Sequence, residues 1–211
     1  MNDRCAACGV PAPWCVCDRL TPRTTRARVL VLQHPQEARE PLGSAPLLAH
    51  ALPGAIVRTG LSWPSLAAAL DDPTAEPGRW GVLWRGQPPR ELTLEEERTP
   101  FLALDRHGNR LRPTDLEGLV VLDGTWSQGK TLWWRNPWLL KLSRVLLWPA
   151  APSAYGRLRK EPRREAVSTL EAVALALSGL GEDPEVEASL LRLFRTFTQR
   201  ARDVPRPAPG A

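Results

Sequence analysis

Polar side chains follow two apolar runs of the sequence, at the point where each run ends. Residues 28–34 read Arg-Val-Leu-Val-Leu-Gln-His, with Glu37 three residues beyond His34, and residues 119–123 read Leu-Val-Val-Leu-Asp. Such runs are typical of strands buried on both faces of a parallel sheet, where ligands bind beyond the carboxyl ends. We therefore predict Asp123 as a general base, with His34 and Glu37 as a functional pair nearby. The alternatives are that Asp123 only caps the following helix and that His34 is structural.

The residues after Asp123 also match the phosphate-binding loop of nucleotide triphosphatases. Residues 124–131 read Gly-Thr-Trp-Ser-Gln-Gly-Lys-Thr, which fits G-x-x-x-x-G-K-[ST] between a strand and a helix. However, the later apolar run at residues 145–148 ends in Pro149 rather than in an aspartate that could hold magnesium. Trp126 would also add bulk to the cradle without a donor for the phosphates. A P-loop nucleotidase is therefore the less favoured alternative.

All four cysteines lie within the first 17 residues, as Cys5-x2-Cys8 followed by Cys15-x-Cys17. Disulfides are rare in a reducing compartment, so such a cluster there indicates a metal site rather than disulfides. Four thiolates complete the tetrahedral shell that structural zinc prefers. We expect these cysteines to bind zinc within a Cys-rich N-terminal segment, residues 1–27. The alternative is a set of free or redox-active thiols.

The elements that would position these side chains alternate between strands and helices. Strands are expected at residues 28–34, 55–58, 80–84, 119–123 and 145–148, and helices at residues 44–52, 62–70 and from residue 127. A capping box formed by Ser168 and Glu171 begins a further helix, and an amphipathic helix around residues 186–197 closes the domain. Residues 91–98 are ambiguous. This alternation predicts an α/β fold with a mainly parallel sheet flanked by helices, in one domain over residues 28–203 followed by a proline-rich tail at residues 204–211.

Basic charge is concentrated in one part of the chain. The formal net charge is +5, with 25 Arg and 3 Lys, and residues 135–164 hold eight basic residues against one acid. Residues 71–123 hold eleven acids against seven Arg. An arginine-rich surface favours a polyanionic partner, because guanidinium binds phosphate in a bidentate manner. The alternative is a solvated basic face.

Composition excludes several protein classes. Hydrophobic residues make up 43% of the 211 residues and charged residues 24%, which are values of a folded globular chain. No run approaches the roughly 18 apolar residues that a membrane span requires. The first residues also lack the apolar core of a signal peptide. We therefore expect a soluble, cytoplasmic protein without a membrane partner.

Five motifs occur in an order that resembles the DTW-domain family. They are Cys-x2-Cys with Cys-x-Cys, residues 33–37, the Asp-Gly-Thr-Trp of residues 123–126, residues 153–162 and residues 168–172. The resemblance covers residues 5 to about 197. It implies a relationship to the SPOUT class of RNA-modifying enzymes, with a knotted cofactor region in the C-terminal half. This chain departs from the family pattern at Gly43-Ser44, where Asn-Thr is frequent.

The resemblance also implies an activity and a set of binding residues. Family members transfer the 3-amino-3-carboxypropyl group of S-adenosylmethionine to N3 of a tRNA uridine and release methylthioadenosine. On this basis Asp123, His34 and Glu37 are expected at the catalytic centre. The expected cofactor-binding residues are Ser44, Thr125, Trp126, Ser153, Tyr155, Arg159, Lys160, Thr169 and Glu171. The expected RNA-binding residues are Arg157, Arg163 and Arg164.

The sequence is compatible with two alternatives for function and two for assembly. The chain could instead be a zinc-containing RNA-binding module without catalysis, because the motifs do not by themselves demonstrate turnover. The sequence is also compatible with either a monomer or a homodimer. S-adenosylmethionine is the expected co-substrate, and tRNA is the expected partner.

Overall fold

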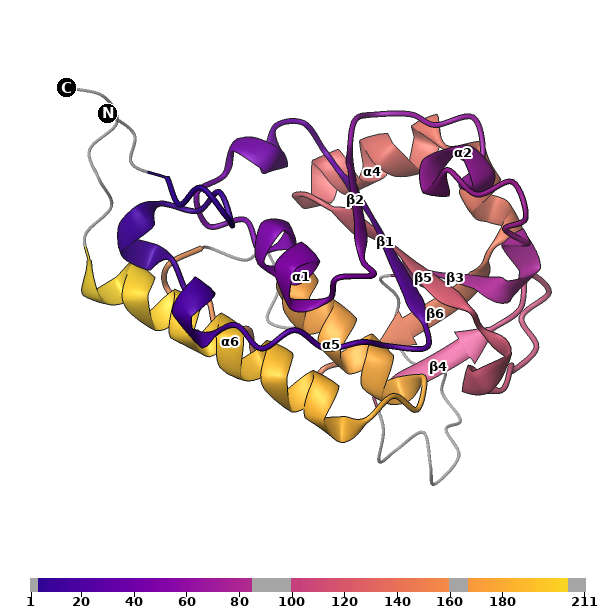
Figure 1. Ribbon diagram of the computed structural model, residues 1–211. Coiled ribbons are helices and arrows are strands. Elements are labelled where there is room, and N and C mark those ends of the chain that lie inside the picture. The colour runs from indigo at the N-terminus through magenta and orange to yellow at the C-terminus, as the bar shows by residue number, and fades with distance from the viewer. Residues whose placement is uncertain (1–3, 85–99, 160–166, 205–211) are drawn as a thin grey trace.

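A six-stranded sheet forms the centre of the computed structural model (Figure 1). The structure describes residues 4–84, 100–159 and 167–204. The strands are β1 (Arg28–Gln33), β2 (Ile56–Thr59), β3 (Trp80–Trp84), β4 (Phe101–Leu104), β5 (Gly118–Asp123) and β6 (Ser143–Leu147). Their order is β2-β1-β5-β3-β6-β4, and every pair is parallel except the antiparallel pair of β4 with β6. The expected α/β class with a mainly parallel sheet is confirmed.

The neighbouring interior strands β1 and β5 are apolar on both faces, as the sequence indicated. Residues 29–32 of β1 and 119–121 of β5 are buried, because helices cover both sides of the sheet. The two strands pair in parallel over their full length, with Gln33 opposite Asp123. This register brings the polar residues that follow the two strands together at the carboxyl-terminal end of the sheet.

Helices pack on the two faces of the sheet in separate layers (Figure 1). One layer contains α1 (Ala45–Ala51), α5 (Thr169–Gly179) and α6 (Pro184–Asp203). The other contains α2 (Leu66–Leu70), α4 (Trp126–Arg135) and the 3-10 helix η6 (Pro137–Lys141). Shorter 3-10 helices are η1 (Ala12–Trp14), η2 (Cys17–Arg19), η3 (Glu37–Arg39), η4 (Pro77–Arg79) and η5 (Pro113–Asp115).

The N-terminal segment packs against α6 and shares the core beneath that helix. Trp14 is fully buried there, with Val10 and Val16 in the same apolar cluster. The Arg200 guanidinium on α6 forms a two-pronged ion pair with the Asp18 carboxylate, with both N···O distances at 2.8 Å. The cysteine-bearing segment is thus tied to the last helix of the chain by apolar and ionic contacts.

Most of the expected elements are present, with shifted ends. The second helix begins at Leu66, because the Ser65 hydroxyl caps it by accepting from the Ala68 amide. The strand β4 was not predicted, since four apolar residues without clear alternation give no periodic signal. The expected C-terminal knot stays a prediction. None of the helices in the three described stretches has both the length and the apolar character needed to cross a bilayer.

Candidate active site and cysteine cluster

The carboxyl ends of β1 and β5 meet where the chain diverges to opposite faces of the sheet. From β1 the chain continues to α1 in one layer, and from β5 it continues to α4 in the other. In open α/β sheets such a point is where ligands bind, because the two connections separate there. The candidate site lies at this position.

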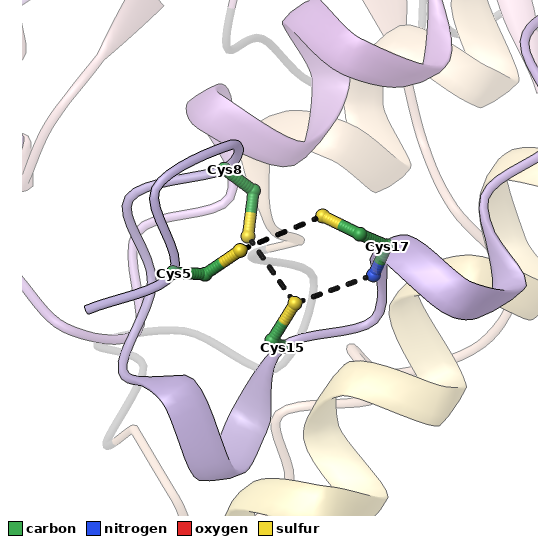
Figure 2. Close-up of side chains that lie close together, drawn as sticks. All are labelled: Cys5, Cys8, Cys15 and Cys17. Carbon is green, nitrogen blue, oxygen red and sulfur yellow. Dashed lines mark hydrogen bonds between the residues drawn. The ribbon is translucent and has the colours of Figure 1, made fainter. Parts of the chain in front are cut away.

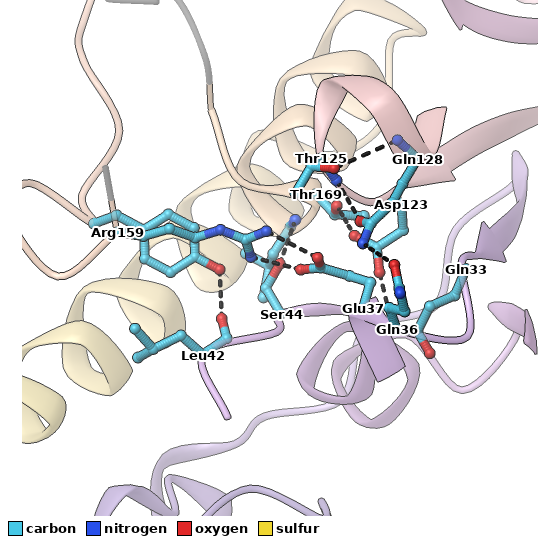
Figure 3. A network of polar contacts seen from close by, with 12 residues as sticks. Gln33, Gln36, Glu37, Leu42, Ser44, Asp123, Thr125, Gln128, Arg159 and Thr169 are labelled. Carbon is cyan, nitrogen blue, oxygen red and sulfur yellow. Dashed lines mark hydrogen bonds and ion pairs between the residues drawn. The ribbon is translucent and has the colours of Figure 1, made fainter. Parts of the chain in front are cut away.

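Asp123 is buried at the end of β5 and is held by neutral donors (Figure 3). Its side chain is 3% exposed. The Gln33 amide donates to Asp123 Oδ2 at 2.8 Å, and the Thr169 hydroxyl donates to Oδ1. Thr59 Oγ1 in turn donates to Gln33 Oε1 at 3.1 Å, which orients the amide so that its NH2 group faces Asp123. The carboxylate is therefore fixed in position by a relay across three strands and the start of α5.

Burial raises the pKa of the Asp123 carboxyl above its usual range, because the charged form loses its hydration. The hydrogen bond from Thr169 lowers this pKa, and the nearby Glu37 charge raises it. The bond from Gln33 and the Arg159 charge act in the lowering direction. A carboxylate whose proton affinity is raised in this way is better matched to accepting a proton near neutral pH.

Glu37 is buried beside Asp123 but has a charged partner. Its carboxylate, 2% exposed, receives two hydrogen bonds from the Arg159 guanidinium at 2.5 and 2.8 Å. The guanidinium lies 5.8 Å from the centre of the Tyr155 ring. The Tyr155 hydroxyl donates to the Leu42 carbonyl at 2.5 Å, and burial raises the pKa of this phenol. Glu37 and Arg159 therefore form a two-point ion pair beside the Tyr155 ring.

Glu171 connects the segment after β6 to the start of α5. Its carboxylate accepts from the Ser153 hydroxyl at 2.6 Å and from the amides of Ala154 and Ser168, both at 2.8 Å. Nearby, Ser44 Oγ accepts from the Leu170 amide at 3.2 Å. These contacts satisfy buried polar groups and fix the residues that carry Thr169 toward Asp123.

His34 is half-buried and Thr125 is exposed, and both lie beside Asp123 in the sequence or in the strand register. The His34 amide donates to the Asp123 carbonyl at 3.0 Å, and its Nδ1 accepts from the Gln36 amide at 3.2 Å. The Thr125 hydroxyl caps α4 by accepting from the Gln128 amide at 3.4 Å. Gly124 precedes it with φ +153°, and an added Cβ there would meet the Gln128 side chain at 2.8 Å.

The P-loop alternative is wrong. Residues 126–131 belong to the helix α4 and do not form a loop. The Gly129 amide donates to the Thr125 carbonyl at 2.8 Å, and the Thr131 hydroxyl donates to the Ser127 carbonyl at 3.1 Å. Amides that are engaged in the helix cannot point together at a phosphate, so the motif match is incidental.

The four cysteines converge in the N-terminal segment (Figure 2). All four Sγ atoms lie within 4.8 Å of one another, and the pairs Cys5–Cys17 and Cys8–Cys15 are each 3.9 Å apart. Zinc bound tetrahedrally at about 2.3 Å from each sulfur separates the sulfurs by roughly 3.8 Å. The donor set and its spacing therefore fit a closed zinc site.

An open cavity of about 430 Å³ lies between the N-terminal segment, η3 and α1. Its lining includes Gln33 and Glu37 of the candidate site, Cys8 of the N-terminal segment and His50 of α1. Its volume lies within the range of small-ligand sites. The cavity thus reaches the candidate site on the side of Glu37.

The structure brings most of the predicted site residues together. Those that lie in or beside the network around Asp123 and Glu37 are His34, Ser44, Thr125, Ser153, Tyr155, Arg159, Thr169 and Glu171. Trp126 is 47% exposed at the first turn of α4, and Arg157 is exposed. Lys160, Arg163 and Arg164 lie outside the described residues. Gln33 and Thr59 were missed as site residues, although Gln33 is the polar residue that ends an otherwise apolar strand.

A family model of the DTW domain matches residues 2–202. The chain belongs to the DTW domain family. It is 28% identical over 210 residues to "tRNA-uridine aminocarboxypropyltransferase 2" of Drosophila melanogaster, covering 96% of this chain and 76% of the fly protein. Proteins of the same name from Macaca fascicularis and Mus musculus are 28% and 29% identical over 192 residues. That stretch is 89% of this chain and 60% of each relative, so the chain spans less than two thirds of those two proteins. No solved structure matches the chain significantly.

Proposed function

We propose that this DTW-domain protein is a tRNA-uridine aminocarboxypropyltransferase. It would transfer the 3-amino-3-carboxypropyl group of S-adenosylmethionine to N3 of a uridine and release methylthioadenosine. The names of its relatives support this activity. The observation that carries the proposal is the buried Asp123 carboxyl, which neutral donors hold at the diverging end of the sheet.

The reaction requires a base because uridine N3 carries a proton. Asp123 accepts this proton as the N3–carbon bond forms, and the carbon–sulfur bond breaks with its electron pair remaining on sulfur. The sulfonium of S-adenosylmethionine supplies the electrophilic carbon. Choosing the aminocarboxypropyl carbon over the methyl carbon is a matter of positioning, which favours a rigid site over a mobile one. The relay through Gln33 and Thr59 supplies that rigidity for the base.

Residues around Asp123 offer the chemistry that the co-substrate needs. The guanidinium of Arg159 matches the carboxylate of the co-substrate by its charge and geometry. Hydroxyl and carboxylate oxygens match the amine and the ribose of the co-substrate. Ser153 and Glu171 bond to each other, so we place Glu171 as a positioning residue for the 153–154 segment. Ser44, Thr125, Trp126, Tyr155, Thr169 and Lys160 stay predictions as cofactor-binding residues.

The cysteine cluster fits a structural zinc ion, held by Cys5, Cys8, Cys15 and Cys17. The ion would fix the N-terminal segment against α6 and against His50, whose Nε2 lies 2.6 Å from the Ala7 carbonyl. Elemental analysis of the purified protein tests this assignment. We expect one zinc per chain in the wild type and no zinc in Cys8→Ser. A protein that has lost its zinc but keeps the stability of the wild type would contradict the assignment.

Incubating the protein with S-adenosylmethionine and unmodified tRNA transcripts tests the activity. We expect a mass gain of one aminocarboxypropyl group on a single uridine and an equal amount of methylthioadenosine. Mapping by nuclease digestion and mass spectrometry identifies the nucleotide. Tight tRNA binding without turnover would instead favour the non-catalytic RNA-binding alternative, and a methylated product would overturn the proposed choice of carbon.

A further inference from the structure

Large exposed apolar side chains occur on α4 and on the 3-10 helix η6 that follows it. Among the residues that the structure describes, four large hydrophobics are exposed: Trp126 (47%), Trp134 (79%), Leu140 (62%) and Val204 (36%). The first three belong to α4 and η6. Exposed apolar surface that is concentrated in this way, rather than scattered singly, indicates an interaction site.

The two tryptophans lie on one face of α4 with a lysine between them. Trp126, Lys130 and Trp134 are four residues apart, so they form a stripe about 12 Å long along the helix. The Lys130 ammonium lies 5.3 Å from the centre of the Trp126 ring. Leu132, on another face of the same helix, is fully buried and anchors α4 to the domain.

The charge of this region indicates the kind of partner. The sequence contains no acidic residue between Asp123 and Glu161, and Lys130, Arg135 and Lys141 are all exposed. Interfaces between proteins are depleted of lysine in their centres. Surfaces for single-stranded nucleic acid instead combine aromatic rings, on which bases stack, with basic groups that contact phosphates. The alternation of tryptophan and lysine on α4 matches the second kind of surface.

The position of α4 connects this face to the candidate site. Asp123 ends β5 and Thr125 caps α4, so the stripe starts three residues from the proposed base and runs away from it. We propose that the stripe formed by Trp126, Lys130 and Trp134 binds unpaired nucleotides next to the modified uridine by stacking. This proposal gives the Trp126 ring to the RNA rather than to the co-substrate. This inference rests on the RNA substrate of the proposed function, and it assigns Trp134 a role outside the family motifs.

Replacing Trp134 by Ala tests the inference through RNA affinity. Because Trp134 is largely exposed, the variant should fold normally. We expect the Kd for an unmodified tRNA transcript, measured by fluorescence anisotropy without S-adenosylmethionine, to rise about 5- to 150-fold, as the loss of ~1–3 kcal/mol of base stacking would produce. Trp134→Phe should restore most of the affinity. The matched control is Val204→Ala, which removes an exposed apolar side chain at the end of α6 and should leave the Kd unchanged.

Salt dependence separates stacking from phosphate contact. The slope of log K against log salt should be the same for Trp134→Ala as for the wild type, whereas Lys130→Gln should reduce it by about 1. Wild-type affinity in Trp134→Ala overturns the inference. A changed oligomeric state with unchanged tRNA affinity also overturns it, because the face would then dock protein.

A parallel transfer assay separates this inference from the proposed function. Binding that depends on Trp134, in a protein that transfers no group to any transcript, supports the stacking face while the proposed activity fails. Transfer by the wild type, with unchanged tRNA affinity in Trp134→Ala, overturns the stacking face alone.

Discussion

Two carboxylates lie equally deep at the ends of neighbouring strands, yet their surroundings differ in kind. Glu37, just after β1, meets the Arg159 guanidinium through two charged hydrogen bonds. Asp123, at the end of β5, receives its two hydrogen bonds from the neutral groups of Gln33 and Thr169. A guanidinium compensates a buried negative charge, whereas neutral donors leave much of its desolvation cost in place.

This difference assigns different tasks to the two groups. The region around Glu37 is a fixed ion pair that holds Arg159 and the segment before residue 160 against the sheet. The region around Asp123 is a site where a proton can be gained at modest cost, because burial already favours the neutral carboxyl. Pairs of acids with contrasting environments are the usual way in which one site separates its proton-transfer group from its structural charge.

Replacing Asp123 by Asn gives the largest expected effect. The substitution keeps the shape and a hydrogen-bond acceptor for Thr169 but cannot accept the N3 proton. We expect the rate of transfer to fall by about 10²- to 10⁴-fold, which is the usual contribution of a general base. The Kd for tRNA should change little. Wild-type transfer by this variant would exclude Asp123 as the base.

Replacing Arg159 by Met tests the ion-pair region. The substitution leaves Glu37 buried without its partner, and we expect the free energy of unfolding to fall by about 3 kcal/mol. The double variant Glu37→Gln with Arg159→Met removes both charges and should recover much of this loss in urea denaturation. If the double variant were as unstable as the sum of the single variants, the pair would not act as a unit.

The contrast also predicts the sign of a pH effect. The pKa of Asp123 is raised on folding, so the stability that its neutral form contributes is present at low pH and is lost as pH rises through the folded-state pKa. Asp123→Asn should therefore gain stability relative to the wild type as pH rises from 4 to 8, measured by urea denaturation. A difference that is constant with pH would contradict the raised pKa.

Asp105 provides a control of opposite sign. It is half-buried, and hydrogen bonds from the side chain and the backbone of Asn109 lower its pKa. Its contribution is present above the unfolded-state pKa and is lost as pH falls through the folded-state pKa. Asp105→Asn should therefore lose stability relative to the wild type at neutral pH, and this difference should shrink on acidification.

The sequence predicted one side of this comparison better than the other. An acid that ends a buried strand is visible from the apolar run before it, so the place of Asp123 at the end of such a strand was predictable. The partner of Glu37 was not, because Arg159 lies 122 residues away and nothing in the local pattern pairs the two. The same limit hid Thr59, whose link to Gln33 exists only once β2 is placed beside β1. The match of residues 124–131 to a phosphate loop was misleading for a related reason, since the motif does not encode that Thr125 already caps a helix that begins at Trp126.

Gln33→Met gives the smallest expected change in stability, and it tests how a neutral donor contributes to the pKa of Asp123. The substitution removes one neutral donor at similar side-chain volume, and we expect it to cost about 1 kcal/mol of stability. Because the Gln33 bond lowers the pKa of Asp123, its loss should raise this pKa further and move the acidic limb of the pH–rate profile upward. The matched control is Gln36→Met, since Gln36 is exposed and its side chain bonds Gln128 instead of Asp123. If the acidic limb of the pH–rate profile moves equally in both variants, Gln33 acts only through the general stability of this region. A shift confined to Gln33→Met identifies Gln33 as the residue that adjusts the pKa of Asp123.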